Sequence, residues 1–526
     1  MRPKKNLLFL ISYFPALVSG MLLTASFPNF NLYTLAFVAL VPLILSIQSM
    51  RSKHSFFAGF AAGFCHYMTL IYWIVPTVTI YGGLHPLLGV STLALLCIYL
   101  SLYVGGFAWL IKQLNPPGGL MPIVGAGLWV GMEYIRTHAL TGFPWGVLGY
   151  SQHSNQTLVQ IADLTGVLGI SFLIVLCNLS LAQLVLYLGS SPASRKISWR
   201  PISAVAAYTL LLLVAALAYG RARLPVIDSL IQAAPKPNIS IVQGNIRQDL
   251  KWDETFKAST IERYGSLSLG IAPTSPELII WPETALPFYY GADTLDSNKT
   301  DVYVRKAKTH FLVGSPAFER GEEKSKFYNR AYMLTPLALV TGFYDKSHLV
   351  PFGEYVPLEA YLTFLGKITQ QAGNFSSGDS TFFPLAFKNH QTGVLICFEI
   401  LFPSIARAFV NNGADMLTTM TNDAWFGVTS AARQHFSVAV LRAVENRRSV
   451  VRAANTGISG FIDPGGRVLE ETDLFTTAAI TRPVPTLKEI SFYTRHGDLL
   501  GIAALVAICL GFMVKGLNNI LRRIQK

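Results

Sequence analysis

Long apolar runs with basic residues at their ends are the feature that most constrains the fold of this chain. Seven runs lie before residue 221 and an eighth lies near the C-terminus: residues 7–24, 32–47, 55–74, 87–111, 121–135, 164–188, 202–219 and 499–514. A helix of about 20 apolar residues spans a bilayer, and it satisfies its own backbone hydrogen bonds in lipid. A signal peptide is a competing interpretation of the first run, but further runs follow it. We therefore predict a membrane domain of about seven helices over residues 1–220 and one more helix within residues 496–526.

The low content of charged residues supports the same conclusion. Only 13% of the 526 residues are charged, whereas ordinary soluble domains carry about 25%. The net charge of +13 comes from basic residues near the ends of apolar runs rather than from a Lys/Arg-rich stripe. We therefore expect a membrane partner and no nucleic acid. No CxxC or His-x-x-x-His spacing occurs, so we expect neither a metal nor another cofactor.

The distribution of basic residues predicts the topology. The residues that follow the second, fourth, sixth and last runs are Arg51, Lys53, Lys112, Arg195, Lys196, Arg200, Lys515, Arg522, Arg523 and Lys526. The loops after the first and third runs, at residues 28–29 and 81–82, contain no Lys or Arg. Because positive charge stays on the cytoplasmic side, we expect both termini in the cytoplasm and residues 221–495 on the outer side.

One outward loop, TGFPWGVLGYSQ at residues 141–152, differs from the others. Its Gly and Pro residues break the helix, and Trp145 and Tyr150 suit a membrane interface. Glu133 is costly in lipid unless it faces a cavity or pairs, and Arg136 one turn on is the candidate partner. We expect either an interfacial aromatic anchor with a local ion pair or part of a lipid-entry mouth.

Residues 221–495 change to the composition of a water-soluble α/β domain. Short strand-like runs at residues 239–243 and 277–281 flank an amphipathic stretch at residues 255–267, and the alternation continues to Gly460. This pattern favours an α/β fold. Roughly 250 residues are enough for one substantial core.

Three polar residues follow apolar runs of this domain. Glu283 ends LIIWPE, Lys346 ends GFYDK, and Cys397 ends VLIC. The other four cysteines lie in the apolar runs, so Cys397 has no obvious disulfide partner. A buried structural cysteine is the alternative interpretation.

The three residue types together suit acyl transfer. A free thiol has a pKa of about 8.5 and is mostly protonated near neutrality. Glu283 can take its proton as general base, and Lys346 can stabilise the oxyanion of a tetrahedral intermediate. The acyl group would then rest on Cys397 as a thioester. A Cys–His pair with His348 or His435 is the second chemical alternative.

These residues resemble a known family. WPETALP at residues 281–287, Lys346 with the downstream Glu354, and the strand ending in Cys397 resemble the Glu–Lys–Cys triad of the nitrilase, or carbon–nitrogen hydrolase, superfamily. TNDAWFG at residues 421–427 is also typical of it. With the membrane runs and TGFPWGVLGYSQ, essentially the whole chain resembles the bacterial apolipoprotein N-acyltransferases. The resemblance implies a four-layer α-β-β-α sandwich in residues 221–495.

The resemblance also implies an activity and its substrates. Such enzymes take an acyl chain from a membrane phospholipid, mainly phosphatidylethanolamine. They pass it to the α-amino group of the S-diacylglyceryl cysteine that begins an apolipoprotein, the last step of lipoprotein maturation. The location implied is the bacterial inner membrane, with the catalytic domain in the periplasm, and we expect a monomer.

The site residues that the resemblance implies extend beyond the triad. Supporting or substrate-binding roles are implied for Trp252, Asn329, Glu354, Phe398, Glu399 and Arg448. Position 398 is often tyrosine in the family, so Phe398 keeps the ring and lacks the hydroxyl.

Residues 355–380 suggest a lid. Their first half is apolar and their second half is rich in Gly and Ser, a pattern that an exposed helix and turn would also show. We expect Leu358, Tyr361, Leu362, Phe364 and Leu365 to dip into the bilayer surface. The expected lipid contacts are therefore Leu358, Phe364 and Leu365, together with Trp145 and Tyr150.

Three other functions compete with acyl transfer. A membrane-tethered amidase or nitrilase would use the same triad and water as acceptor. A transporter would need paired charges within its helices, where Glu133 and His66 are nearly all that the runs offer. An inactive scaffold would have no need of the triad.

The predicted topology has a direct test. A reporter that is active only in the cytoplasm, fused near Gly291, should be silent because residues 221–495 are predicted to lie outside. Fusion of the same reporter after residue 526 should be active and serves as the control. Activity near Gly291 would contradict the topology.

Overall fold

The structure is a computed structural model that describes residues 3–117, 119–190, 199–249, 251–321, 325–355 and 375–524. The chain forms two compact units, which we describe separately. The first contains Met1–Ile74, Val90–Arg223 and His496–Lys526, and the second contains Val75–Gly89 and Leu224–Arg495.

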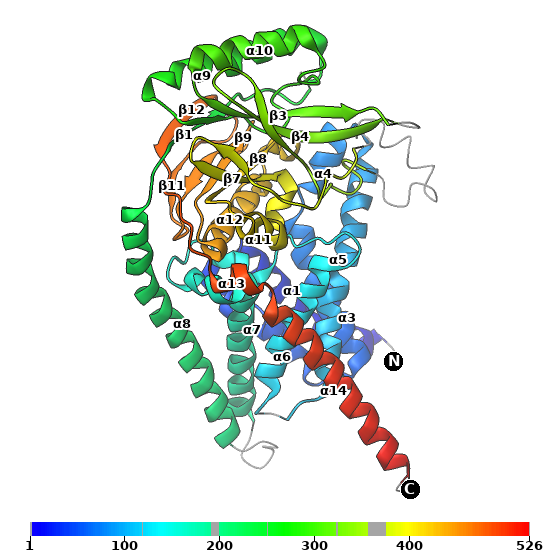
Figure 1. The fold of residues 1–526 in the computed structure, drawn as a ribbon. Coiled ribbons are helices and arrows are strands. Elements are labelled where there is room, and N and C mark those ends of the chain that lie inside the picture. The colour runs from blue at the N-terminus through cyan, green and yellow to red at the C-terminus, as the bar shows by residue number, and fades with distance from the viewer. Residues whose placement is uncertain are drawn as a thin grey trace. The chain divides into compact units, whose positions relative to one another are not determined.

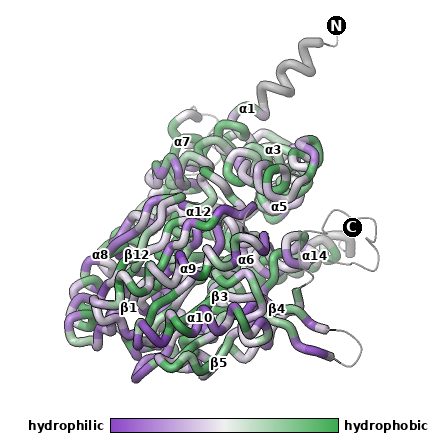
Figure 2. The backbone as a smooth tube through the Cα atoms, turned by 90° about the horizontal axis from the view of Figure 1, so that it is seen from above, coloured by the Kyte–Doolittle hydropathy of each residue, from purple (hydrophilic) through white to green (hydrophobic). Residues whose placement is uncertain are grey.

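The first unit is built from apolar helices. They are α1 (Pro3–Ala25), α2 (Val41–Ile47), α3 (Ser52–Leu70), α5 (Pro86–Leu114), α6 (Met121–His138), α7 (Ala162–Gly189), α8 (Trp199–Ala233) and α14 (Leu499–Ile524), of which α5 and α8 continue into the second unit. The apolar stretches of α3 and α5 can be followed as green tube in Figure 2.

Within the described ranges, four helices are long and apolar enough to cross a membrane: Pro86–Leu114, Leu158–Gly189, Trp199–Ala233 and Leu499–Asn518. A fifth crossing is possible if Ser52–Leu70 and Ile74–Tyr81, which meet at 58°, form one broken span. The chain thus has a helical membrane domain, and the total of about eight spans stays a prediction.

The second apolar run does not form one continuous span. Residues 33–47 fold as a 3-10 turn, Tyr33–Phe37, followed by the short helix α2. Proline occupies the first turn of α2, where its missing N–H costs no helical hydrogen bond. The expectation of a single helix over residues 32–47 was therefore wrong.

Small residues let the helices of this unit approach closely. A Cβ atom on Gly20 would lie 2.5 Å from the Ala62 carbonyl oxygen, and one on Gly59 would lie 2.5 Å from that of Val104. These glycines bring α1 against α3 and α3 against α5. Helices in a bilayer commonly associate through such positions because contact between backbones replaces the hydrophobic effect.

Glu133 and Arg136 are both buried, but they form no ion pair with each other in the described structure. Glu133 Oε1 accepts from the Leu148 N–H at 2.7 Å, and an Arg136 guanidinium nitrogen donates to the Trp145 carbonyl at 2.7 Å. The local ion pair, which belonged to one of the two alternatives, is thus not formed at contact distance. Each side chain instead bonds the backbone of the 141–152 loop, whose peptide groups need partners away from water.

The loop's two aromatic side chains lie inside the protein. Trp145 is 4% exposed and Tyr150 is 2% exposed, and the Trp145 ring lies 4.6 Å from that of Trp73. Exposure this low does not favour an anchor at the membrane surface. Contact with an acyl chain that enters the protein stays a prediction.

The second unit contains two six-stranded sheets. The first has the order β12-β1-β2-β3-β4-β5, with β12 Ala478–Pro483, β1 Asn238–Gln243, β2 Leu278–Ile280, β3 His310–Glu319, β4 Lys326–Leu334 and β5 Val340–Asp345. The second has the order β11-β10-β9-β8-β7-β6, with β11 Val468–Glu471, β10 Gly460–Ile462, β9 Val450–Ala454, β8 Met416–Thr421, β7 His390–Ile396 and β6 Leu385–Phe387.

The two sheets share one pairing pattern. In each, three neighbouring strands are parallel: β1, β2 and β3 in the first, and β7, β8 and β9 in the second. An antiparallel strand flanks each trio on one side, β12 or β6, and two flank it on the other, β4–β5 or β10–β11. Carboxyl ends of parallel strands meet at one edge of a sheet. Glu283 follows β2, Cys397 follows β7 and Asn422 follows β8.

Helices cover the outer faces of both sheets. α9 (Glu254–Ile271) and α10 (Thr294–Ala307) lie along the first sheet, and α11 (Pro403–Asn411) and α12 (Ser430–Asn446) lie along the second. Figure 1 shows the strands between these helix pairs. The predicted α-β-β-α sandwich is confirmed.

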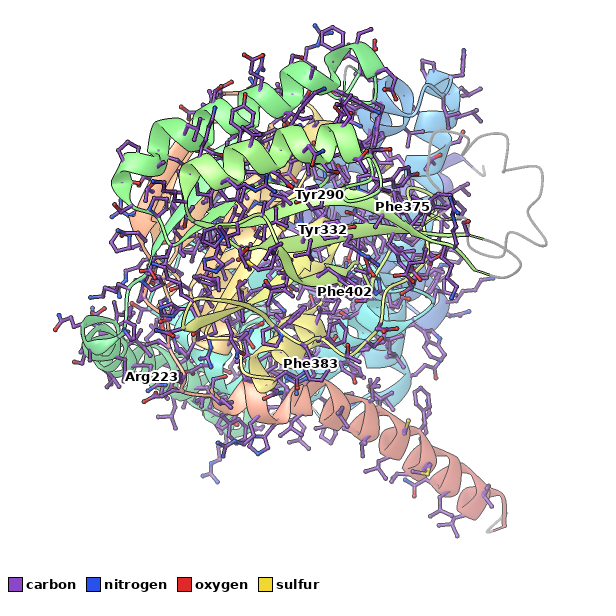
Figure 3. The ribbon with its side chains drawn as sticks, turned by 45° about the horizontal axis from the view of Figure 1, so that its top comes forward. Arg223, Tyr290, Tyr332, Phe375, Phe383 and Phe402 are labelled. Carbon is purple, nitrogen blue, oxygen red and sulfur yellow. The ribbon has the colours of Figure 1, made fainter. Side chains whose placement is uncertain are left out.

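The core under α9 and α10 fixes the start of the turn that follows β2. Trp281, the residue after β2, is fully buried, and its indole N–H donates to Ser268 of α9 at 2.9 Å. The rings of Tyr290 and Tyr332, both labelled in Figure 3, lie 5.3 Å apart in the same core. Burial of such aromatic side chains stabilises the domain strongly. Because Trp281 is held in this core, the direction in which the chain leaves β2 is fixed.

Gly314 of β3 packs directly against the turn that contains Glu283. A Cβ atom at position 314 would lie 2.5 Å from the Pro282 carbonyl oxygen, 2.6 Å from the Thr284 nitrogen and 2.9 Å from the Glu283 Cα. All three are backbone atoms, which cannot move aside as a flexible side chain would. Only glycine fits here without displacing the turn.

Gly314→Ala should therefore displace Glu283 and destabilise the domain by about 1–3 kcal/mol, the usual cost of overpacking. A lower melting temperature and slower modification of Cys397 by a small electrophile would both be expected. Gly270→Ala on α9 is the matched control, because nothing lies within 4 Å of its added Cβ. Equal behaviour of the two variants would contradict the close packing.

Candidate active site

Glu283 is held by three polar neighbours. Its Oε1 accepts from the Asn329 side-chain amide at 2.7 Å and lies 3.5 Å from Lys346 Nζ. Its Oε2 accepts from the Asn422 backbone N–H at 2.9 Å. The residue is 7% exposed, so these contacts replace the water that a carboxylate requires.

Lys346 is the buried cation of the site. It follows β5, is 1% exposed, and its Nζ donates to Glu354 Oε1 at 2.9 Å. Burial alone would lower the pKa of this ammonium, but Glu354, Glu283 and Cys397 outweigh burial and raise the pKa above its ordinary value. Lys346 therefore stays protonated and suits charge stabilisation rather than proton transfer.

Glu354 and Asn329 complete the cluster around Lys346. Glu354 Oε1 also accepts from the Asn329 amide at 3.3 Å, and its Oε2 accepts from the Val350 N–H at 2.8 Å. Asn329 lies on β4 and its carbonyl accepts from the Lys346 N–H at 2.9 Å. The amide of Asn329 thus bridges both carboxylates and fixes their separation.

Cys397 stands at a strained turn between β7 and a short 3-10 helix. Its φ of 53° lies in the left-handed region, which costs about 1–3 kcal/mol for a residue other than glycine. It retains some solvent exposure. Burial and the charge of Glu283 raise the pKa of the thiol, whereas Lys346 lowers it. The net shift is upward, so the resting thiol is protonated and reaction requires a base.

Glu399 ties the Cys397 turn to the Lys346 segment. Its Oε2 accepts from the Ile396 N–H at 2.7 Å, just before Cys397. Its Oε1 accepts from the Ser347 N–H at 2.8 Å, from the His348 N–H at 3.1 Å and from the Tyr344 hydroxyl at 2.8 Å. One fully buried carboxylate therefore holds the C-terminal ends of β5 and β7 together.

His435 supports the Cys397 backbone rather than its thiol. Its Nε2 lies 3.1 Å from the Cys397 carbonyl oxygen, and its Nδ1 lies 3.1 Å from Asp423 Oδ1 and 3.0 Å from an Arg452 guanidinium nitrogen. Burial and Arg452 lower the pKa of His435 although Asp423 opposes them. The neutral ring donates from Nε2 to the carbonyl, and this geometry favours the Glu–Lys–Cys arrangement over a Cys–His pair.

His348, the other histidine considered for a Cys–His pair, packs against aromatic rings at a tilt of 35°. Its ring centre lies 3.7 Å from that of Phe402 and 6.0 Å from that of Phe398. Phe402 is labelled in Figure 3. Phe398 is 7% exposed and also packs edge-on to Phe402 at 5.3 Å. The aromatic ring at position 398 is thus used in packing.

Two other residues were expected to support the site. Arg448 is buried and bonds backbone carbonyls of Ala414 and Glu489. Trp252 is 50% exposed. The lid positions Leu358, Tyr361, Leu362, Phe364 and Leu365 lie outside the described residues.

The structure also brings residues to the site that the sequence analysis missed. The Asn422 backbone N–H binds Glu283, and a backbone donor has no sequence pattern, although TNDAWFG marked the segment. Lys251 is 3% exposed and its Nζ donates to the Glu283 carbonyl at 3.3 Å. It precedes the noted Trp252, but nothing in its local pattern separates it from a surface lysine.

The TNDAWFG segment also contacts a distant part of its own unit. The Tyr81 ring, from the Val75–Gly89 segment, lies 6.2 Å from the Trp425 ring at 71°. This edge-to-face contact places the Val75–Gly89 segment beside the turn that contains Asn422. Aromatic pairs of this geometry contribute about 0.5–1.5 kcal/mol beyond the area that they bury.

Fold and site together define the class. A buried Glu–Lys pair beside a cysteine, at the strand ends of an α-β-β-α sandwich on a chain with apolar helices, is the arrangement of a membrane-bound enzyme of nitrilase type.

Comparison with known proteins specifies the family. Residues 19–180 match the apolipoprotein N-acyltransferase N-terminal domain, and residues 238–488 match the carbon–nitrogen hydrolase domain. The apolipoprotein N-acyltransferase of Geobacter metallireducens is 40% identical over 96% of both chains. That of Pasteurella multocida is 30% identical over 96% of this chain and 95% of its own. The chain belongs to the apolipoprotein N-acyltransferase family.

Solved structures are similar at a lower level. An amidase from Nesterenkonia sp. is 17% identical, with a TM-score of 0.37, over 50% of this chain and 94% of its own. At these values the similarity adds nothing to the family assignment.

Glu399→Gln should slow the modification of Cys397 by a small electrophile by at least about tenfold. The glutamine amide would face N–H donors of Ile396 or Ser347 with its own N–H groups, so at least one hydrogen bond to the carboxylate would be lost. A hydrogen bond to a charged group contributes about 1.5–3 kcal/mol. Glu470→Gln, at a partly exposed salt bridge with Arg482, is the control. Unchanged reactivity of Glu399→Gln would contradict the role of Glu399 in holding the turn.

Proposed function

We propose that this chain transfers a fatty acyl chain from a membrane phospholipid to the α-amino group of the S-diacylglyceryl cysteine that begins an apolipoprotein. The observation that carries the proposal is the buried Glu283–Lys346 pair, 3.5 Å apart, whose charges both act on the partly exposed Cys397. Membership of the apolipoprotein N-acyltransferase family supports the choice of substrates.

The first step acylates Cys397. Glu283 takes the proton of the thiol, whose raised pKa makes this base necessary. The thiolate sulfur attacks the ester carbonyl carbon, and the Lys346 ammonium stabilises the oxyanion that forms. The ester C–O bond then breaks, and the proton on Glu283 passes to the leaving lysophospholipid oxygen.

The second step releases the acyl group to the acceptor. The neutral α-amine attacks the thioester carbonyl, and Glu283 takes a proton from the amine nitrogen. The C–S bond breaks and the Cys397 thiolate regains the proton from Glu283. Two steps through one thioester suit a donor and an acceptor that are both lipids, because they need not occupy the site together.

The location and partners are part of the proposal. Residues 221–495 would form the catalytic domain in the periplasm, residues 1–220 the membrane domain in the bacterial inner membrane, and residues 496–526 the final helix and basic tail. Phosphatidylethanolamine would be the main donor, and the chain would act as a monomer. Roles in substrate binding are proposed for Trp252 and for the lid positions Leu358, Phe364 and Leu365.

A membrane-tethered amidase is the second candidate, and the same cluster favours it. Glu283, Lys346 and Cys397 would form the same acyl-enzyme, and water would replace the amine. Dependence of acyl release on an amine acceptor separates the two functions.

Intact-mass analysis after exposure to phosphatidylethanolamine without acceptor tests the proposal. We expect one added acyl mass that neutral hydroxylamine removes, because a thioester is cleaved under conditions that leave an amide intact. Cys397→Ala should give no adduct, since the sulfur nucleophile is gone.

Two controls make this result decisive. Cys509→Ala should keep the adduct, because Cys509 lies on α14, outside the catalytic unit. Addition of a diacylglyceryl-cysteine peptide should discharge the adduct faster than water alone. A folded protein that gives no adduct, or one that water discharges equally fast, would contradict the acyltransferase.

A further inference from the structure

Lys251 is a second buried ammonium beside the catalytic carboxylate. It lies in the segment between β1 and α9, and its Nζ donates to Thr284 Oγ1 at 2.5 Å and to the Glu283 backbone carbonyl at 3.3 Å. Both acceptors belong to the turn that presents the Glu283 side chain. Thr284 has a φ of 46°, a conformation that needs external support in a residue other than glycine.

The surroundings of Lys251 are unusual for a buried charge. Within the described residues it forms no ion pair at contact distance, and the charges that act on it are those of Glu283 and Cys397. Lys346, by contrast, contacts two carboxylates. A buried ammonium without a direct counter-ion is costly, which indicates that its charge is used.

The charge balance of the cluster indicates what the positive charge of Lys251 does. Glu283 and Glu354 are two carboxylates around one ammonium, Lys346, so this group carries one net negative charge. Such a charge opposes formation of a thiolate at Cys397. A positive charge on Lys251 brings the formal sum to zero before the thiol ionises. Two further carboxylates lie near this group. Glu399 is stabilised by N–H and O–H donors, and Asp423, whose charge also acts on Cys397, pairs with Arg452 at 2.7 Å.

We propose that Lys251 is a positioning residue for acylation: it holds the Glu283–Thr284 turn and supplies the second positive charge against which the Cys397 thiolate forms. This inference rests on the proposed function for the acylation step. It assigns to Lys251 a role distinct from that of Lys346, whose ammonium faces the oxyanion.

The charge of Lys251 makes the reaction sensitive to alkaline pH. Burial lowers the pKa of this ammonium to about 8, although Glu283 and Cys397 oppose the shift. The charged form is thus complete below pH 7 and is lost as pH rises through 8. A group of this pKa keeps about one tenth of its charge at pH 9. Lys346, with a raised pKa, stays charged throughout this range.

The test compares Lys251→Arg, Lys251→Gln and wild type in two assays at pH 7 and pH 9. The first is single-turnover acylation by phosphatidylethanolamine without acceptor, which avoids titration of the α-amine. The second is alkylation of Cys397 by iodoacetamide, located by peptide mass. Lys257→Met is the control, because it removes a lysine from α9 whose partner Glu254 is exposed.

The expected results separate charge from shape. Lys251→Gln should lower both rates at pH 7 by at least about fivefold, since a unit charge in the interior contributes that much or more. Between pH 7 and pH 9, the acylation rate of wild type should fall by up to about tenfold more than that of Lys251→Arg. Arginine stays charged over this range, whereas lysine at this position does not. Lys257→Met should match wild type.

The contrary result is equally specific. Equal rates for Lys251→Gln and wild type in the alkylation assay would overturn the role of Lys251. So would a pH 9 to pH 7 ratio that is the same for wild type, Lys251→Arg and Lys251→Gln, because a merely structural lysine would change the rate and leave that ratio alone. Alkylation needs no lipid, so it decides on Lys251 even if phosphatidylethanolamine gives no adduct, a result that would count against the proposed function alone.

Discussion

The ammonium of Lys346 is the contact on which the catalytic cluster depends. It lies between Glu283 and Glu354 at 3.5 and 2.9 Å, and those carboxylates in turn hold the Asn329 amide and the Val350 N–H. Removing one partner from such a buried group leaves an uncompensated charge and costs about 3–5 kcal/mol. The positions of Glu283, Glu354 and the loop after β5 therefore all depend on one side chain.

The nucleophile is constrained by a different set of contacts. Glu399 binds the backbone before Cys397 and His435 binds the backbone carbonyl of Cys397 itself. Both of these contacts are made to the main chain. A left-handed φ at Cys397 persists only where neighbours over-determine it. These contacts support Glu283 as the proposed base, and a buried histidine near Cys397 does not by itself indicate a Cys–His pair.

Sequence patterns identified site residues that follow predicted strands. They failed to identify contacts that are made by backbone groups or by residues far away in the sequence. Glu283, Lys346 and Cys397 could be found because each follows an apolar run, and the sandwich followed from the family resemblance. Asn422 contributes an N–H, which every residue has. Glu133 and Arg136 sit three residues apart on a helix, so an ion pair was the natural expectation, yet the 141–152 backbone takes both. Lys251 looks like a surface lysine in the sequence, and only the fold shows that it is buried against the Glu283–Thr284 turn.

The closing strand of the first sheet has a consequence for biosynthesis. β12 pairs with β1 along its whole length, from Asn238 opposite Pro483 to Gln243 opposite Ala478, and nearly the entire domain lies between them in the chain. Pairing across such sequence separation is slow, because the connecting chain must first be ordered. While the chain emerges from the ribosome, β1 is an open edge that invites association with other proteins. The first sheet is therefore complete only when β12, which lies shortly before α14 in the chain, has been synthesised.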